Sequence, residues 1–198
     1  MPITNDVQLQ NVLQRIGTDL QDVQNYLGNT RRTDAKFRFP RGFIRRAADL
    51  RKRFGFLRDD TLKRNLSYQL ILSDVFRWLL NRSDITGTAQ EMLIKEGICL
   101  FASQSETILR VYCGNRTSKK KGVPGRIQFL VSTSVLDSNA ADELNWLWKT
   151  RCALHLYLVE QREHQIYKIS DYNRGRNAYR SLGRSISEYE LRRRKANA

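Results

Sequence analysis

Hydrophobic residues in the N-terminal part of the chain recur at alternating steps of four and three residues. They occupy positions Leu9, Leu13, Ile16, Leu20, Val23 and Leu27. This heptad pattern is typical of a coiled-coil seam, and it predicts a helix over residues 5–28 that ends at Gly28. Two interpretations of the seam stay open, because it can pair two copies of the chain or pack on the rest of the protein.

Wide apolar faces at helical spacing mark three later stretches of the chain. Residues 60–82 and residues 89–112 each predict a long helix, and Thr88 with Glu91 has the spacing of a capping box at the start of the second. A third long helix is predicted from residue 140 to about residue 168. The apolar positions expected in the core include Leu66, Leu70, Ile94, Ile98, Phe101, Ile108, Leu144 and Leu147.

The remaining stretches have weaker patterns. Residues 43–54 favour a short helix, residues 114–125 a polar loop, and residues 126–136 either a strand or a short helix. Because alternating strand patterns are nearly absent, we predict an all-α fold. It would be a helical bundle of four to five helices with an N-terminal heptad helix.

These patterns divide the chain into four parts. No apolar run approaches the roughly 18 residues of a membrane-spanning helix, and no secretory signal is recognisable. We therefore expect a cytoplasmic protein with no membrane contact. The parts are the N-terminal heptad helix (1–29), a basic connector (30–59), a helical bundle (60–170) and an arginine-rich C-terminal tail (171–198) that is frayed or bound to a partner.

Basic residues give the chain a formal net charge of +15, and most of it lies in two segments. Residues 31–59 have eleven Lys or Arg and three Asp, and residues 174–195 have eight Lys or Arg and two Glu. Such concentration favours a polyanionic partner, RNA first and DNA as an alternative. The other interpretation is that the charge only aids solubility. The candidate phosphate-binding residues are Arg41, Arg45, Arg46, Arg51, Lys52, Arg53, Arg174 and Arg176.

No metal site or cofactor is predicted. His155 and His164 are the only histidines, and Cys99, Cys113 and Cys152 have no zinc-binding spacing. The three thiols are expected to be reduced. Any chemistry is therefore expected to depend on side chains alone.

The stretch of residues 151–157, RCALHLY, is the candidate for such chemistry. On a helix Arg151 and His155 lie about one turn apart on the same face. Histidine can give or take a proton near neutral pH, and the arginine fork matches a phosphate and the charge that grows on it. Two such pairs in a symmetric dimer can cleave RNA without a metal. The alternative is a packed histidine on a core helix.

An all-α bundle whose late helix carries Arg151, His155 and Tyr157 in this order resembles the HEPN domain. It is similar in particular to the HEPN toxins that are paired with nucleotidyltransferase antitoxins, and the resemblance covers roughly residues 60–170. It implies a metal-independent endoribonuclease that acts as a homodimer, often in toxin–antitoxin or anti-phage defence systems. Arg151 and His155 would be the catalytic pair, and Tyr157 the tyrosine that an antitoxin can modify with a nucleotide.

Two details of the resemblance bear on activity. The Arg–His spacing is shorter than is usual in the family, and Lys149 is a second cation at a more family-like distance. Lysine lacks the planar fork with which arginine binds a phosphate. Many HEPN-like proteins bind RNA or proteins without cleavage, so the alternative function is a non-catalytic nucleic-acid-binding or protein-interaction module.

Overall fold

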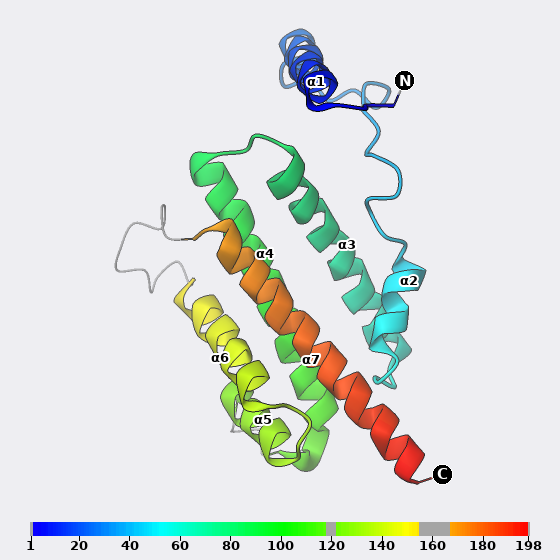
Figure 1. The fold of residues 1–198 in the computed structure, drawn as a ribbon, viewed down its shortest axis with the longest axis vertical. Coiled ribbons are helices and arrows are strands. Elements are labelled where there is room, and N and C mark those ends of the chain that lie inside the picture. Colours follow the sequence, from blue (N-terminus) through cyan, green and yellow to red (C-terminus); the bar gives the residue numbers. More distant parts are fainter. Residues whose placement is uncertain (1, 118–121, 155–166, 198) are drawn as a thin grey trace. The chain divides into compact units, whose positions relative to one another are not determined.

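The computed structural model describes residues 2–117, 122–154 and 167–197 (Figure 1). This part of the chain folds into seven α-helices and two short 3₁₀ helices, with no strand. The predicted all-α class is confirmed, although the helices outnumber the four to five that the sequence predicts. The chain forms two compact units, Met1–Pro40 and Arg41–Ala198.

Helix α1 (Asp6–Leu27) makes up most of the N-terminal unit. It begins where the Asn5 side chain accepts a hydrogen bond of 2.9 Å from the Gln8 backbone N–H. It ends at Gly28, whose φ of +53° favours glycine. The predicted heptad helix is thus confirmed. None of its residues is buried, and the seam is exposed at Leu9, Leu13, Ile16, Leu20 and Val23.

The second unit begins with residues that the sequence assigned to the connector. The short helix α2 (Ala47–Arg51) packs against α3 (Asp60–Arg82), and the 3₁₀ turn η1 (Lys52–Phe54) follows α2 directly. Leu50 and Phe54 are buried at 1% and 2% exposure. The basic segment is therefore held in place by two apolar anchors, which fixes the arginines beside them.

Helix α4 (Gly87–Cys113) is the central helix and packs on α3, α5, α6 and α7. Its N-cap is Thr86, without a side-chain cap bond. The predicted capping box is therefore wrong, because the helix already begins before Thr88. Glu91 is buried, and its Oε1 accepts a 3.4 Å hydrogen bond from the Tyr167 backbone N–H instead of capping α4.

Two helices follow in the stretch that was hardest to predict. Residues 126–136 were compatible with a strand or a short helix, and the structure has a helix there, α5 (Gly122–Ser132). Its buried residues recur at helical spacing. Helix α6 (Ser138–Ala153) begins at the Asp137 N-cap, whose side chain accepts a 2.7 Å hydrogen bond from the Ala140 N–H. It ends at Ala153, and residues 155–166 of the helix predicted to reach about residue 168 lie outside the described residues.

Helix α7 (Ile169–Ala196) occupies the stretch where a frayed tail was expected. Leu182 and Ile186 are fully buried. In Figure 1 this helix lies across α4, between α3 and α6. At the closest approach, a Cβ on Gly97 of α4 would be 2.4 Å from the ring of Tyr172 on α7, so only glycine fits there. This approach sets the position of α7 against the rest of the bundle.

Candidate nucleic-acid interface

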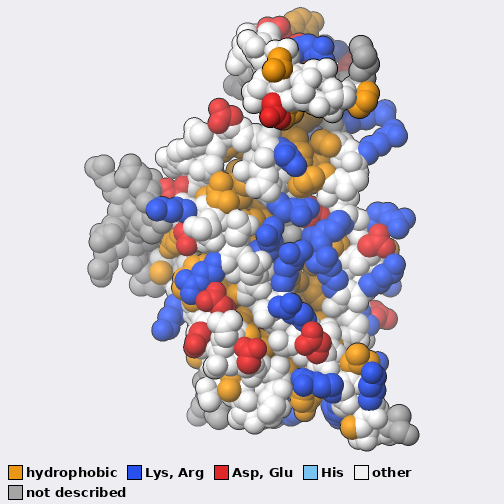
Figure 2. Space-filling model, in the orientation of Figure 1, with side chains coloured by type: hydrophobic (Ala, Val, Ile, Leu, Met, Phe, Trp, Pro, Cys, Tyr) orange, Lys and Arg blue, Asp and Glu red, His pale blue; other side chains and the backbone are white. Residues whose placement is uncertain are grey.

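Arginine side chains from three segments of the second unit line one hollow at its surface. Arg45 precedes α2, Arg53 lies in η1 and Arg77 on α3, while Arg176 and Arg180 are one turn apart on α7. These five residues are called the arginine cluster below. Figure 2 shows Lys and Arg side chains gathered in the middle of the visible face of this unit, over α3 and α7.

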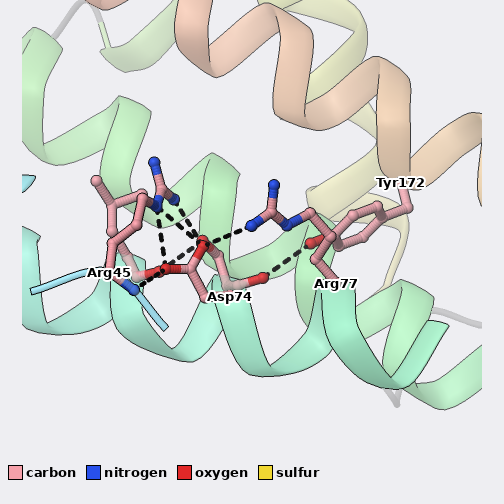
Figure 3. Close-up of polar contacts among 6 residues, drawn as sticks. Arg45, Asp74, Arg77 and Tyr172 are labelled. Carbon is pink, nitrogen blue, oxygen red and sulfur yellow. Dashed lines mark hydrogen bonds and ion pairs between the residues drawn. The ribbon is translucent and has the colours of Figure 1, made fainter. Parts of the chain in front are cut away.

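Asp74 of α3 lies at the base of this hollow, with a side chain that is 1% exposed. Its carboxylate accepts hydrogen bonds from the Arg45 backbone N–H at 3.1 Å, from Nε at 3.0 Å and from Nη2 at 2.7 Å. Arg77 donates a further one at 3.5 Å. Figure 3 shows the two guanidinium groups reaching the carboxylate from two sides. Asp74 thus ties the segment before α2 to α3.

The other three arginines of the cluster have no comparable partner. Within the described part of the chain, no carboxylate forms an ion pair with Arg53, Arg176 or Arg180, and Asp74 is the only acidic residue lining the hollow. The Nε atoms of Arg77 and Arg176 are buried, and no described residue accepts a hydrogen bond from either of them. Because a guanidinium group has five donors and no acceptor, the hollow has donors in excess.

Crowding of positive charge affects the pKa values of the cluster. Burial, and after it the charge of Arg45, lowers the pKa of Arg53 below its ordinary value. Burial, followed by the charges of Arg176 and Arg53, lowers the pKa of Arg180. Arginine nevertheless stays charged at neutral pH. The guanidinium groups of the cluster therefore repel one another in the folded protein, and a bound anion would reduce this repulsion.

Two tyrosines of α7 form the inner wall of the hollow. The rings of Tyr172 and Tyr179 pack on Phe101 of α4, with centres 5.5 and 5.7 Å away. The Tyr172 hydroxyl donates a 3.2 Å hydrogen bond to the Ser73 carbonyl of α3, and burial raises its pKa to about 12. Burial also raises the pKa of Tyr179, against the charges of nearby arginines. Both hydroxyls are thus protonated donors at neutral pH.

The arginine cluster contains only some of the predicted phosphate-binding residues. Arg46 and Lys52 are ion-paired with Asp49 instead, at 2.9 and 3.1 Å. These exposed pairs leave less free charge on α2 than the sequence suggests. The predicted residues that the structure brings together at the hollow are Arg45, Arg53 and Arg176.

The remaining predicted contacts lie outside the hollow. Arg174 forms a bidentate pair with Glu143 of α6, with both distances 2.8 Å, and its guanidinium lies 4.1 Å from the centre of the Trp146 ring. Arg41 is exposed, and Arg51 is half-buried on α2. Arg174 therefore joins α6 to α7 and is not available to the cluster.

The polar residues of the hollow that the sequence does not predict as functional include Asp74, Arg77, Tyr172, Tyr179 and Arg180. The sequence does indicate that the residues of α7 lie together. Arg176 lies three positions before Tyr179 and four before Arg180, and residues at this spacing share one face of a helix. The high density of arginines in residues 171–198 hides this spacing, because it favours the interpretation of the segment as a tail. Asp74 and Arg77 are three positions apart on α3, so their spacing likewise places them on one face of a helix.

The RCALHLY stretch is described only in part. Arg151 is half-buried in the last turn of α6, with its guanidinium 5.2 Å from the centre of the Trp148 ring. His155 and Tyr157 lie outside the described residues. The prediction that Arg151 and His155 share one helical face therefore concerns a residue outside the described part of the chain.

Lys149, the second cation considered near Arg151, is exposed on α6. It lines a shallow hollow together with Trp146 and Trp148. Residues two positions apart on a helix do not share a face. Lys149 and Arg151 therefore lie on different faces of α6 and do not form one site there.

Comparisons with protein-family models, with curated proteins and with solved structures found no match. Among the described residues, no group of His, Cys, Asp and Glu can hold a metal ion. No helix in this part of the chain is both long and apolar enough to cross a membrane. The geometry alone thus defines the class of site: a cluster of guanidinium groups able to bind an anion.

Proposed function

We propose that the second unit binds RNA through phosphate contacts at the arginine cluster. One observation carries the proposal: five arginines line one hollow, and the only carboxylate that lines it among the described residues is already bonded to Arg45 and Arg77. Guanidinium forks match phosphate oxygens in geometry and in charge. The three remaining arginines offer donors that no acceptor of the described residues takes up.

The convergence of charge at the hollow argues against a purely solubilising role. Arg46, Lys52 and Arg174 each have a carboxylate partner. At the hollow, by contrast, like charges from three segments converge. Such convergence of like charges is unfavourable without an anion. A bound phosphate would offset this repulsion, which supports a binding role for the hollow.

The affinity for RNA is expected to fall steeply with salt. For single strands the logarithm of the binding constant falls with a slope of about −0.7 per neutralised phosphate, so three contacts give a slope of about −2. The measurement is fluorescence anisotropy of a labelled single-stranded RNA over a KCl series, with duplex DNA of the same length for comparison. Absence of binding to either nucleic acid at low salt would contradict the proposal.

A second candidate function is metal-independent cleavage of RNA, which the HEPN resemblance implies. The observation that favours it is the environment of Arg151: the side chain is half-buried, and its guanidinium lies against Trp148. An arginine held in this way can stabilise charge that develops on a phosphate. Under this proposal the setting is a toxin–antitoxin or anti-phage system, with an antitoxin or defence-system partner.

The wild-type protein is then expected to cut a mixed pool of RNAs in the presence of EDTA and to leave 2′,3′-cyclic phosphate ends. Arg151→Ala and His155→Ala should each slow cutting by about 10²–10⁴-fold, the range typical of general acid–base groups, and leave RNA binding nearly unchanged. Gel analysis of the products checks this. If all three proteins bind RNA and none cuts it, the function is binding alone.

Pairing of two chains is also part of the proposal, and the exposed seam of α1 is the surface we assign to it. The seam is self-complementary, because a heptad stripe packs best on another heptad stripe. In a parallel pair, only one charged residue per chain, Asp19, lies at the positions that flank the seam. Like charges on the two chains therefore do not face each other there. These flanking residues are Gln10, Val12, Gly17, Asp19, Gln24 and Tyr26.

The wild-type protein is accordingly expected to have twice the 23.2 kDa mass of the single chain. Leu13→Glu combined with Leu20→Glu should reduce the mass to that of one chain, since both carboxylates would be buried in the seam. Gln14→Glu with Gln21→Glu adds the same charge to the exposed opposite face of α1 and serves as the control. Light scattering after size exclusion gives the masses, and a monomeric wild-type protein would rule out the pairing.

A further inference from the structure

We propose that the arginine cluster is a discrete site for one phosphomonoester group, the terminal phosphate of an RNA strand. The inference rests on the proposed RNA binding and adds which phosphate enters the hollow. An internal phosphate has two ester oxygens and a single negative charge, whereas a terminal phosphate has three free oxygens and up to two charges. The hollow matches the terminal group in number of donors and in charge.

The donors that remain free match three phosphate oxygens. Arg53, Arg176 and Arg180 have no ion-pair partner among the described residues, and Tyr179, whose pKa is raised by burial and lowered by the charges of Arg53 and Arg180, lines the same hollow. Each guanidinium fork can take one oxygen of a monoester, and the hydroxyl adds a further donor. A diester presents only two free oxygens, so one fork would stay unsatisfied.

The balance of charge points the same way. Five guanidinium groups against the carboxylate of Asp74 leave four positive charges in excess around the hollow. A phosphomonoester has a charge of about −1.5 to −2 at pH 7, because its second pKa is near 6. It therefore relieves more of the repulsion among the arginines than the single charge of a diester.

The size of the hollow excludes a base. Its volume is about 20 Å³, where roughly 10–15 Å³ holds one water molecule. Tyr172 and Tyr179 are 2% and 6% exposed and pack on Phe101, so neither ring offers a face on which a base can stack. The hollow therefore admits one or two oxygens of the phosphate but no base, and the nucleoside remains outside. The site is thus expected to select a terminal phosphate without regard to sequence.

The test compares three single-stranded RNAs of one sequence that end in a 5′-phosphate, in a 3′-phosphate or in hydroxyl groups at both ends. At near-physiological salt we expect at least one phosphorylated form to bind about tenfold more tightly than the hydroxyl form. Arg180→Gln and Tyr179→Phe should reduce that preference to less than threefold. Arg174→Gln, on the same helix but paired with Glu143, should keep it. Circular dichroism checks that each variant is folded.

A pH series adds a readout that a general basic surface would not give. The preference for the phosphorylated RNA should rise between about pH 5.5 and 7.5, because the monoester gains its second charge near pH 6. The hydroxyl form has no group that titrates in this range. Its affinity should therefore change little over the same series.

Two outcomes overturn the inference, and they differ in what they say of RNA binding. Equal affinity for all three RNAs would make the cluster an ordinary backbone-binding surface, and RNA binding itself would stand. No binding of any RNA would overturn the proposed function as well. In that case a rise in the Tm of the wild-type protein with inorganic phosphate, absent in Arg180→Gln and absent with chloride at equal ionic strength, would show a phosphate site without an RNA partner.

Discussion

Replacement of Arg176 and Arg180 together by glutamine is expected to lower the affinity for single-stranded RNA about a hundredfold at low salt. A hydrogen bond to a charged group contributes about 1.5 kcal/mol at the lower end of its range, and 1.4 kcal/mol is a factor of ten. Glutamine keeps the helix propensity of arginine. Arg180 is exposed and Arg176 half-buried on α7, so the fold should tolerate both changes.

The salt dependence of the same variant separates lost contacts from a general loss of affinity. Each phosphate that is no longer neutralised makes the salt slope of a single-stranded complex shallower by about 0.7, so the double variant, which loses its contacts with one terminal phosphate, should lose about 0.7. Anisotropy titrations over a KCl series give both quantities. An unchanged slope with a lower affinity would mean that the two arginines act through the shape of the site rather than through phosphates.

A matched control removes the same charge from the same helix. Arg192 and Arg194 are exposed near the C-terminal end of α7 and do not line the hollow. Arg192→Gln with Arg194→Gln should reduce the affinity only a few-fold, through the weaker general attraction. Equal losses in the two double variants would contradict a localised site and favour attraction by net charge alone.

The helices that the sequence predicts well have their start and stop signals nearby in the chain. Helix α1 lies between Asn5 and Gly28, and α3 begins at Asp59, whose side chain accepts a 3.0 Å hydrogen bond from the Leu62 N–H. Capping depends on residues three positions apart. Such signals can be recognised without knowledge of the tertiary structure, and the apolar periodicity between them then predicts the element.

Helix α7 was missed because its composition conceals its pattern. Tyr172, Tyr179, Leu182 and Ile186 are all buried and succeed one another at steps of seven, three and four. Four of the eleven intervening positions are arginines, whose long stems can cover apolar surface while the charged ends stay in water. The net charge suggested a tail, whereas the apolar spacing alone predicts a helix packed on one face.

The arginine cluster is only partly predictable for a different reason. Arg176 and Arg180 share a helical face, and so do Asp74 and Arg77, which local spacing reveals. The approach of Arg45 to Asp74 crosses 29 positions of the chain, and that of Arg53 to α7 is longer still. These contacts depend on how α2, α3 and α7 pack, and no local pattern encodes that packing.

Asp74→Asn is expected to lower the free energy of unfolding by about 3 kcal/mol, in the range found when one partner of a buried ion pair is removed. The Asp74 carboxylate is buried and accepts hydrogen bonds from both Arg45 and Arg77. Asparagine keeps the shape but loses the charge that both arginines need. Thermal unfolding should show a Tm lower by about 6–12 °C, since each kcal/mol shifts a domain of this size by about 2–4 °C.

Asp49→Asn is the matched control for this loss of stability. Asp49 also has two cationic partners, Arg46 and Lys52, but the pairs are solvent-exposed. Exposed pairs contribute little because water screens them, so the Tm should hardly change. Similar shifts for both variants would mean that the burial of Asp74 does not matter.

The RNA affinity of the Asp74→Asn variant shows whether Asp74 only stabilises the fold or also helps the arginines around it to bind RNA. The carboxylate offers nothing to a phosphate and repels it, so its removal raises the positive charge of the hollow. The folded Asp74→Asn protein should therefore bind terminally phosphorylated RNA at least as tightly as the wild-type protein, and bound phosphate should recover part of the lost Tm. A variant that is stable but no longer binds RNA would instead place Asp74 among the contacts that position the nucleic acid.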